Sequence, residues 1–272
     1  MKIVVIGAGV AGLAIGWRLA EDGQEVTVLD RGQPGRGATW ASAGMLAVTA
    51  ELQDSSHEEV EFAHYSNGLW PDFAKQIEVV SGRNIAFAPY GALMLAGDAL
   101  SLASLEHLAA QPGLAILDAG QVREIAPLVS GDIVGGLWAP QEARVDNRTL
   151  GEALAIALRK AGGRLLANEA VVRIERDATR AVGVRTPFGF YAADAVVLAA
   201  GAWSGLIEPR IAAVAPVKGQ MILLMPPPGE TAPAPVIWGN GIYAVPRGNA
   251  LAIGATVEDA GFDTGITDEG RD

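Results

Sequence analysis

The first thirty residues constrain the fold of this chain more than any other segment. Residues 3–6 form an apolar run that is typical of a parallel strand buried on both faces. Three glycines follow in the spacing G-x-G-x-x-G, and they introduce an amphipathic helix that ends at Gly23. A second strand at residues 25–29 then leads to Asp30. This order of strand, glycine turn, helix, strand and acid predicts a Rossmann-type unit that binds a dinucleotide.

Each part of this motif has a distinct expected task. Gly7 permits the tight turn, Gly9 lets the backbone approach a pyrophosphate, and Gly12 lets the helix pack closely on the strand. The first N–H groups of the helix offer a partial positive charge to phosphates. Asp30 stands where a carboxylate can accept hydrogen bonds from ribose hydroxyls. The predicted nucleotide-binding residues of this segment are Gly7, Gly9, Val10, Ala11, Gly12 and Asp30.

Composition narrows the classes of function. The net charge is −11 and no cluster of Lys and Arg occurs, which argues against binding to nucleic acid. The chain has no cysteine, which excludes disulfides, thiolate catalysis and Fe–S clusters. We interpret His57, His64 and His107 as ordinary surface or packing residues and predict no metal site. No run approaches the roughly 20 apolar residues of a membrane helix, and no targeting segment precedes the first strand, so we expect a cytoplasmic protein without membrane insertion.

A second informative stretch is the small-residue loop GRGATWASAGMLA at residues 35–47, which follows Asp30 and Arg31. It resembles a loop of the FAD-dependent amine oxidoreductases related to D-amino acid oxidase, glycine oxidase and sarcosine oxidase. In that family an acid and an arginine precede a small-residue loop that ends in Ala-Gly-Met or Ala-Gly-Leu. The resemblance implies FAD as the cofactor and adds Arg31 to its binding residues. It also implies that Ala38 and Thr39 contact the phosphates, and that Ala43, Gly44 and Met45 contact the isoalloxazine ring.

Two later segments extend the resemblance. The stretch ANEAVVRIERD resembles the strand whose backbone binds the adenine, which implies a contact from Val171. The stretch DAVVLAAGAWS resembles the strand that returns to the nucleotide, with Gly201 at its end. Some relatives attach FAD covalently through a histidine that follows Thr-Trp in the small-residue loop. Ala41 stands at that position here, so the resemblance implies a non-covalent FAD.

The remaining pattern predicts two interleaved domains of an α/β protein. A helical segment is expected over residues 55–80, with a break before Pro71. The stretch IYAVPRGNALAIGATV predicts an antiparallel hairpin that turns at Gly248 and Asn249. We predict a discontinuous, Rossmann-type FAD-binding domain from residues 1–81 and 145–207. An inserted substrate domain, an antiparallel sheet of α+β type, is predicted from residues 82–144 and 208–272.

The C-terminal end departs from the family pattern. Thr267 and the two acids after it predict the start of a helix that does not follow. Family members continue with an arginine-bearing segment that binds the substrate carboxylate and a glycine-rich stretch that closes over the flavin. Neither segment is present in these 272 residues. We therefore expect the FAD-closing segment to be absent, which leaves open whether this chain is active.

The resemblance implies the oxidative deamination of a small, glycine-like amino acid or amine. Tyr243 matches a substrate-facing tyrosine, although a tyrosine also packs well within a sheet, and Arg247 is interpreted as a charge at the hairpin end. Oxygen would be reduced to hydrogen peroxide, and the imine would serve thiazole formation in thiamine synthesis. Two alternatives stay open: a D-amino acid dehydrogenase or sarcosine oxidase-like enzyme, and an inactive FAD-binding fragment. A homo-oligomer is compatible with the sequence.

Overall fold

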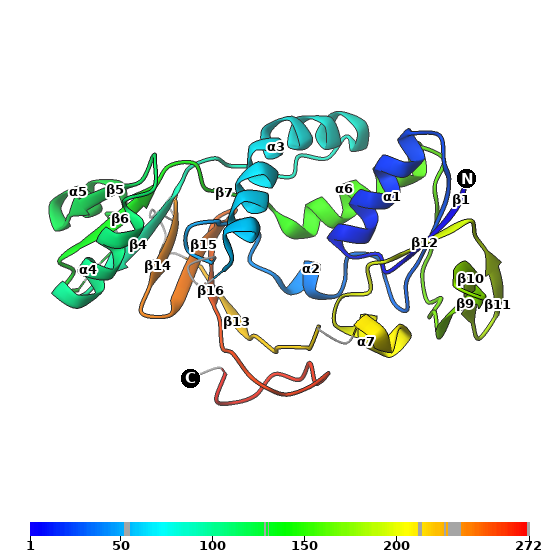
Figure 1. Ribbon diagram of the computed structural model, residues 1–272. Coiled ribbons are helices and arrows are strands. Elements are labelled where there is room, and N and C mark those ends of the chain that lie inside the picture. Colours follow the sequence, from blue (N-terminus) through cyan, green and yellow to red (C-terminus); the bar gives the residue numbers. More distant parts are fainter. Residues whose placement is uncertain are drawn as a thin grey trace. The chain divides into compact units, whose positions relative to one another are not determined.

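The computed structural model describes residues 1–51, 55–127, 129, 131–211, 214–225, 227 and 235–270. The chain divides into two compact units, each drawn from three segments, and Figure 1 labels their elements. The first unit comprises Met1–Ser42, Phe73–Ile85 and Asn147–Pro216, and the second comprises Ala43–Asp72, Ala86–Asp146 and Val217–Asp272. Residues 43–72 therefore group with the second unit, whereas the division drawn from the sequence placed them with the first.

The first unit is built on a four-stranded parallel sheet in the order β12-β1-β2-β8. Its strands are β1 (Lys2–Ile6), β2 (Glu25–Leu29), β8 (Arg164–Leu166) and β12 (Ala195–Leu198). The central pair, β1 and β2, is buried in all but its first residues. This burial explains the continuous apolar run of β1, and the parallel order of the strands confirms the predicted Rossmann-type sheet.

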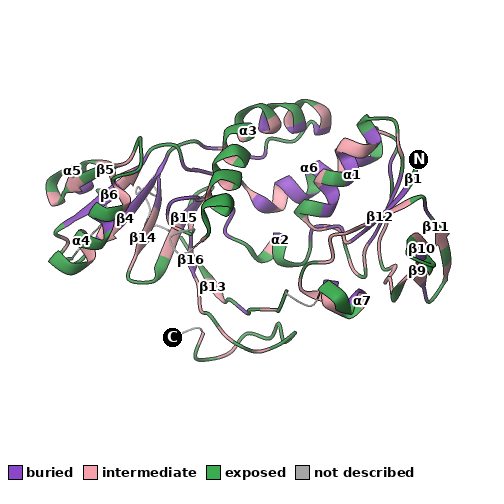
Figure 2. Cartoon of the chain, viewed as in Figure 1, coloured by how far each residue is buried: buried purple, intermediate pink, exposed green. Residues whose placement is uncertain are grey.

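Helices α1 (Val10–Glu21) and α6 (Asn147–Lys160) pack against each other in this unit. Their buried residues include Leu13, Trp17, Leu154 and Leu158. Buried stretches of both helices are purple in Figure 2. Gly16 allows α1 to approach β2, because a Cβ there would lie 2.9 Å from a Val28 methyl group. The smaller elements of the unit are α2 (Ala38–Ala41), α7 (Ser204–Ile207), the 3-10 turns η1 (Gly201–Trp203) and η2 (Pro209–Ile211), and an antiparallel sheet of β9 (Arg173–Asp177), β10 (Arg180–Thr186) and β11 (Gly189–Ala192).

Helix α3 runs from His57 to Ser81 and contains Pro71 in its interior. The predicted break before Pro71 is therefore wrong. A proline removes one backbone N–H, and so one helical hydrogen bond, but the bonds on either side of it can remain. None of the helices in the described part of the chain is long and apolar enough to cross a membrane.

The second unit contains a seven-stranded sheet in the order β13-β16-β15-β14-β4-β6-β5, in which only the β14–β4 pair is parallel. Its strands are β4 (Ala92–Ala96), β5 (Ala115–Asp118), β6 (Gly135–Ala139), β13 (Met221–Leu224), β14 (Val236–Gly239), β15 (Ile242–Arg247) and β16 (Ala250–Gly254). Strands β15 and β16 form the predicted hairpin, with Arg247 opposite Ala250 and Gly248 at a φ of +58°.

Two helices cover opposite faces of this sheet. Helix α4 (Ala99–Leu108) packs its Leu105 against Met94, and α5 (Ala119–Ile125) packs its Val122 against Leu93. Successive residues of a strand point to opposite faces, so Met94 lies on the face covered by α4 and Leu93 on the face covered by α5. Two short antiparallel strands, β3 (Met45–Leu46) and β7 (Ala143–Arg144), complete the unit. Thr267 starts no helix: Gly270 N donates to its hydroxyl oxygen in a turn.

Candidate functional site

The glycine turn after β1 contains backbone contacts that exclude any side chain. Gly7 has a φ of +101°, and a Cβ on it would lie 2.3 Å from the carbonyl oxygen of Ala199. A Cβ on Gly12 would lie 1.9 Å from the carbonyl oxygen of Gly7. A Cβ on Gly9, in contrast, would meet only the hydroxyl of Thr39, at 3.4 Å. Packing therefore requires Gly7 and Gly12, while Gly9 leaves room for a ligand to approach the first turn of α1.

Asp30 bridges this turn and the segment that follows β2. Its Oδ2 accepts a hydrogen bond from Ala8 N at 2.6 Å, and its Oδ1 accepts one from Gly32 N at 2.8 Å. A carboxylate offers about four acceptor positions, so these bonds orient Asp30 and leave capacity for ribose hydroxyls. Arg31 lies beside it with its guanidinium 4.5 Å from the centre of the Trp203 ring.

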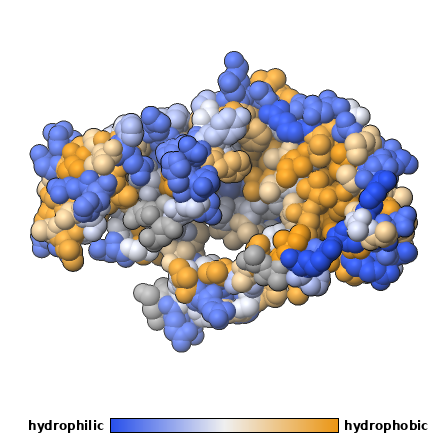
Figure 3. All heavy atoms as spheres, viewed as in Figure 1, coloured by the Kyte–Doolittle hydropathy of each residue, from blue (hydrophilic) through white to orange (hydrophobic). Residues whose placement is uncertain are grey.

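Thr39 completes the N-terminus of α1. The N-cap residue of α1 is Gly9, which has no side chain, and the Thr39 hydroxyl accepts the Val10 N–H at 2.9 Å. The N–H groups of Ala11 and Gly12 belong to the same first turn, where a helix leaves donors without helical partners. Hydrophobic residues reach the surface of the unit around α1, where Val10 and Ile15 are 40% and 39% exposed (Figure 3).

Two residues that the sequence analysis did not identify hold α2 in place. Asn147, which is buried at the start of α6, donates from Nδ2 to the carbonyl oxygens of Thr39 and Trp40. Arg148 donates to the Trp40 carbonyl, and its guanidinium and that of Arg36 lie 4.3 and 3.5 Å from the centre of the Trp40 ring. Ala38 and Thr39 are thus fixed through α6. An asparagine before an amphipathic run is typical of a helix cap. The sequence around Asn147 therefore did not indicate its contact with Thr39 and Trp40.

Val171 and Gly201 also belong to the first unit. Strand β9 begins only at Arg173, so Val171 lies in the segment before the strand rather than within it. Its side chain packs against the core of Val4, Ile6 and Leu29. Gly201 follows β12 with a φ of +54° and opens the turn η1. Their assignment to adenine and nucleotide contacts stays a prediction.

Ala43, Gly44 and Met45 belong to the second unit. Gly44 has a φ of +84°, and its carbonyl oxygen accepts the Val145 N–H at 2.8 Å. Met45 pairs with Arg144 in the β3–β7 ladder. This loop, which we call the cofactor loop (residues 43–46), is therefore held as a short strand by residues a hundred positions further along the chain.

Tyr243 lies on the face of the large sheet that carries Met45. Its ring is 5.2 Å from that of Trp238, its hydroxyl donates to Met221 Sδ at 3.5 Å, and it packs with Met45 against one core cluster. Arg247 lies on the same face, because alternate residues of β15 share a face, and its Nη2 donates to the carbonyl oxygen of Ala43 at 3.4 Å. Arg247 thus stands at the hairpin end, opposite Ala250, as predicted, and the structure adds its contact with Ala43.

The sequence analysis also did not identify two acids of the second unit, Glu51 and Glu142. Desolvation of the Glu51 carboxyl, and secondarily the negative charge of Glu142, raise the pKa of Glu51. Burial, and then the charge of Glu51, raise the pKa of the Tyr243 hydroxyl, which keeps it a neutral donor. Glu51 and Glu142 are 91 positions apart in the sequence, so no local pattern indicated that their charges interact. Within the described residues, no group of three or more His, Asp or Glu side chains could hold a metal ion.

The chain is similar to known proteins over nearly its whole length. The sequence profile of a family described as FAD dependent oxidoreductase matches residues 2–272. A bifunctional protein ThiO/ThiG of Trichormus variabilis is 34% identical over 268 residues, which are 96% of this chain but only 40% of that protein. The glycine oxidase of Geobacillus kaustophilus is 32% identical over 280 residues and is covered to 72% of its length. The crystal structure of a glycine oxidase from that organism superimposes with a TM-score of 0.91 at 30% identity, covering 99% of this chain and 75% of that chain.

Proposed function

The chain belongs to the FAD-dependent oxidoreductase family, and on that premise we propose that it oxidises a small, glycine-like amino acid or amine. One observation carries this proposal beyond the family: Arg247 binds the cofactor loop to the sheet face that presents Tyr243. A loop of small residues beside a neutral hydroxyl suits a flat cofactor and a small substrate. The similarity to glycine oxidases supports a substrate of this size.

The residues of the first unit fit the nucleotide part of FAD. The space beside Gly9 admits a pyrophosphate, the first turn of α1 supplies N–H donors, and Asp30 retains acceptor capacity for the ribose. We propose that Gly7, Gly9, Val10, Ala11, Gly12, Asp30, Arg31, Ala38, Thr39, Val171 and Gly201 form this part of the site. With Ala41 after Trp40 and no cysteine in the chain, FAD is bound without a covalent link.

In the second unit, Ala43, Gly44 and Met45 hold the flavin ring, and Tyr243 binds the substrate. Bound FAD would supply the acceptor for a hydride from the substrate α-carbon, and oxygen would be the final electron acceptor, reduced to hydrogen peroxide. The Tyr243 hydroxyl donates a hydrogen bond to the substrate carboxylate. The negative charge of Glu51 nearby favours an amine. The protein thus orients the substrate, which is the main contribution that such chemistry asks of side chains. The similarity to a bifunctional ThiO/ThiG protein supports a use of the imine in thiamine synthesis.

The decisive experiment loads the purified chain with FAD and adds glycine without oxygen. Bleaching of the flavin, followed by hydrogen peroxide when air is admitted, is the expected result. Activity with dye acceptors but not with oxygen favours a dehydrogenase. A yellow protein that no small amine bleaches, with sarcosine and D-alanine also tested, favours an FAD-binding fragment without catalysis.

A further inference from the structure

The segment from Glu142 to Val145 holds the cofactor loop along its length. Val145 N donates to Gly44 O at 2.8 Å, and Arg144 and Ala143 pair with Met45 and Leu46. The segment is itself anchored to the large sheet, because Gly91 N donates to the carbonyl oxygen of Glu142 at 2.9 Å. The cofactor loop therefore takes its position from a rigid neighbour rather than from its own small residues.

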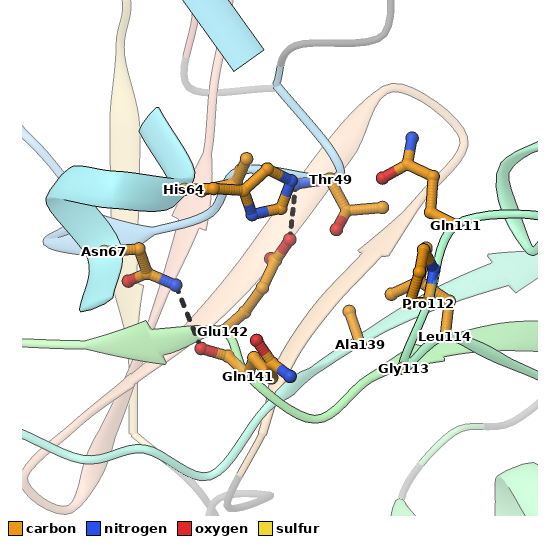
Figure 4. Close-up of a pocket in the computed structure, with 11 residues that line it drawn as sticks. Thr49, His64, Asn67, Gln111, Pro112, Gly113, Leu114, Ala139, Gln141 and Glu142 are labelled. Carbon is orange, nitrogen blue, oxygen red and sulfur yellow. Dashed lines mark hydrogen bonds between the residues drawn. The ribbon is translucent and has the colours of Figure 1, made fainter. Parts of the chain in front are cut away.

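Glu142 extends this support beyond the last pair of the ladder. Its side chain reaches the turn that follows the cofactor loop, and Oε1 accepts the Thr49 N–H at 2.6 Å (Figure 4). The residue is only 3% exposed. Burial raises the pKa of its carboxyl, and the hydroxyl and N–H of Thr49 and the N–H groups of Val48 and Ala50 oppose that rise. Successive N–H groups that face one carboxylate form an anion-binding turn, so residues 48–50 are shaped around this side chain.

The second carboxyl oxygen is buried, and Glu142 is one of the residues that line a small cavity. Oε2 of Glu142 has no hydrogen-bond partner among the residues that the structure describes. The cavity beside it has a volume of about 30 Å³ and is lined by polar side chains, including His64, Asn67 and Gln141 (Figure 4). That volume accommodates one water molecule.

We propose that Glu142 is a positioning residue, which fixes the turn at residues 48–50 through the Thr49 N–H and thereby sets both Met45 and Glu51. The turn connects the two: Met45 precedes it in the cofactor loop, and Glu51 follows it and contributes through its charge to the raised pKa of Tyr243. A buried carboxyl is costly to desolvate and adds little net stability, so a role in local conformation accounts for it better than a role in overall stability. The functional consequence, though not the conformational one, rests on the proposed oxidase activity.

Two variants of Glu142 and one control test this role. Glu142→Met keeps a similar volume without the acceptor, and Glu142→Gln keeps an acceptor oxygen. We expect amide hydrogen exchange at Thr49 to become at least about tenfold faster in Glu142→Met and to stay near the wild-type rate in Glu142→Gln. The control is Val122→Ala, which opens a space under α5 in another cluster of the same unit. It should lower the unfolding temperature and leave exchange at residues 44–51 unchanged.

The same variants separate positioning from stability. In the FAD-loaded protein, Glu142→Met should raise the KM for the amine roughly threefold to tenfold, with an unfolding temperature close to that of the wild type. A lower unfolding temperature with unchanged exchange at Thr49 would identify a purely structural residue and overturn the proposal. Equal effects of Glu142→Met and Glu142→Gln on exchange would also overturn it. Exchange needs no substrate, so a wild-type protein that oxidises no amine would refute the proposed function and leave this measurement decisive.

Discussion

The nucleotide end of the first unit and the cofactor loop of the second are built by different means. In the first unit, Gly7, Gly12 and Asp30 come from thirty consecutive residues, and their contacts are with backbone atoms. In the second unit, the cofactor loop is held by side chains and strands from distant segments, among them Glu142 and Arg247. The backbone of the nucleotide end should therefore be disrupted when space beside its glycines is filled, whereas the position of the cofactor loop should change when a single distant side chain is removed.

The largest effect is expected from Gly12→Ala. The added Cβ would lie 1.9 Å from the carbonyl oxygen of Gly7, where only a shift of α1 can relieve the clash. We expect the free energy of unfolding to fall by about 3 kcal/mol or more, measured by urea denaturation. Gly68→Ala is the matched control, because a Cβ there meets nothing within 4 Å inside α3 and should stabilise by up to about 1 kcal/mol. Similar losses in both variants would refute the packing role of Gly12.

Asp30→Ala should have the next largest effect, and on FAD rather than on the fold. A hydrogen bond to a charged group contributes about 1.5–3 kcal/mol. Its loss should weaken FAD binding roughly tenfold to a hundredfold, measured by flavin fluorescence on dilution. FMN lacks the adenosine and should bind as before. Asp30→Asn keeps one acceptor oxygen, which can serve either the Ala8 or the Gly32 N–H group, and should lose less than Asp30→Ala. Unchanged FAD affinity in Asp30→Ala would contradict the dinucleotide assignment.

Arg247→Ala tests the cofactor loop by removing one side chain. The bond to the Ala43 carbonyl is long, at 3.4 Å, so we expect a loss of about 1 kcal/mol, or roughly fivefold in affinity for FAD or its flavin part. In contrast to Asp30→Ala, this variant should weaken FMN and FAD alike. Arg123→Ala, which removes an arginine that donates to the Ala119 and Gly131 carbonyls elsewhere in the same unit, is the control and should leave both affinities unchanged. An effect on FAD alone would place Arg247 with the nucleotide end instead.

The smallest effect is expected from pH. The contributions of Glu208 in the first unit and Glu142 in the second unit to stability change in opposite directions as the pH rises. Hydrogen bonds and ion pairs with Arg210 and Arg176 lower the pKa of Glu208, in the first unit, from 4.5 to about 2. Its stabilisation is present above pH 4.5 and is lost as the pH falls toward 2. Burial raises the pKa of Glu142, in the second unit, so its contribution is greatest below pH 4.5 and is lost as the pH rises through its folded-state pKa.

Acid titration of unfolding, with exchange resolved by residue, separates the two responses. Glu208→Gln should flatten the loss of stability between pH 4.5 and about 2 in the first unit only. Glu142→Gln should remove the loss that the second unit suffers as the pH rises. The same response of both units to either variant would show that they do not unfold separately.

The sequence predicted the contacts that are local and the elements with a clear period. The Ala8–Asp30 hydrogen bond joins residues 22 positions apart within one strand–helix–strand unit, where the order of elements dictates the geometry. The β15–β16 hairpin was predicted from its alternation and turn residues, which act over a few residues. Pro71 was misjudged because a local preference against helix was outweighed by the helical bonds on both sides of it.

The sequence alone therefore determined the dinucleotide unit and, by resemblance, its cofactor. A position that has no room for a Cβ requires glycine, and such positions recur at the fixed spacing of the motif. Only the tertiary structure revealed the supports of α2 and the cofactor loop. Asn147 reaches Thr39 across 108 positions, Glu142 reaches Thr49 across 93, and Arg247 reaches Ala43 across 204. Each of these residue types has many ordinary uses on a helix or strand. Its task here depends on which distant backbone group the fold brings within hydrogen-bond distance, and no local pattern encodes that.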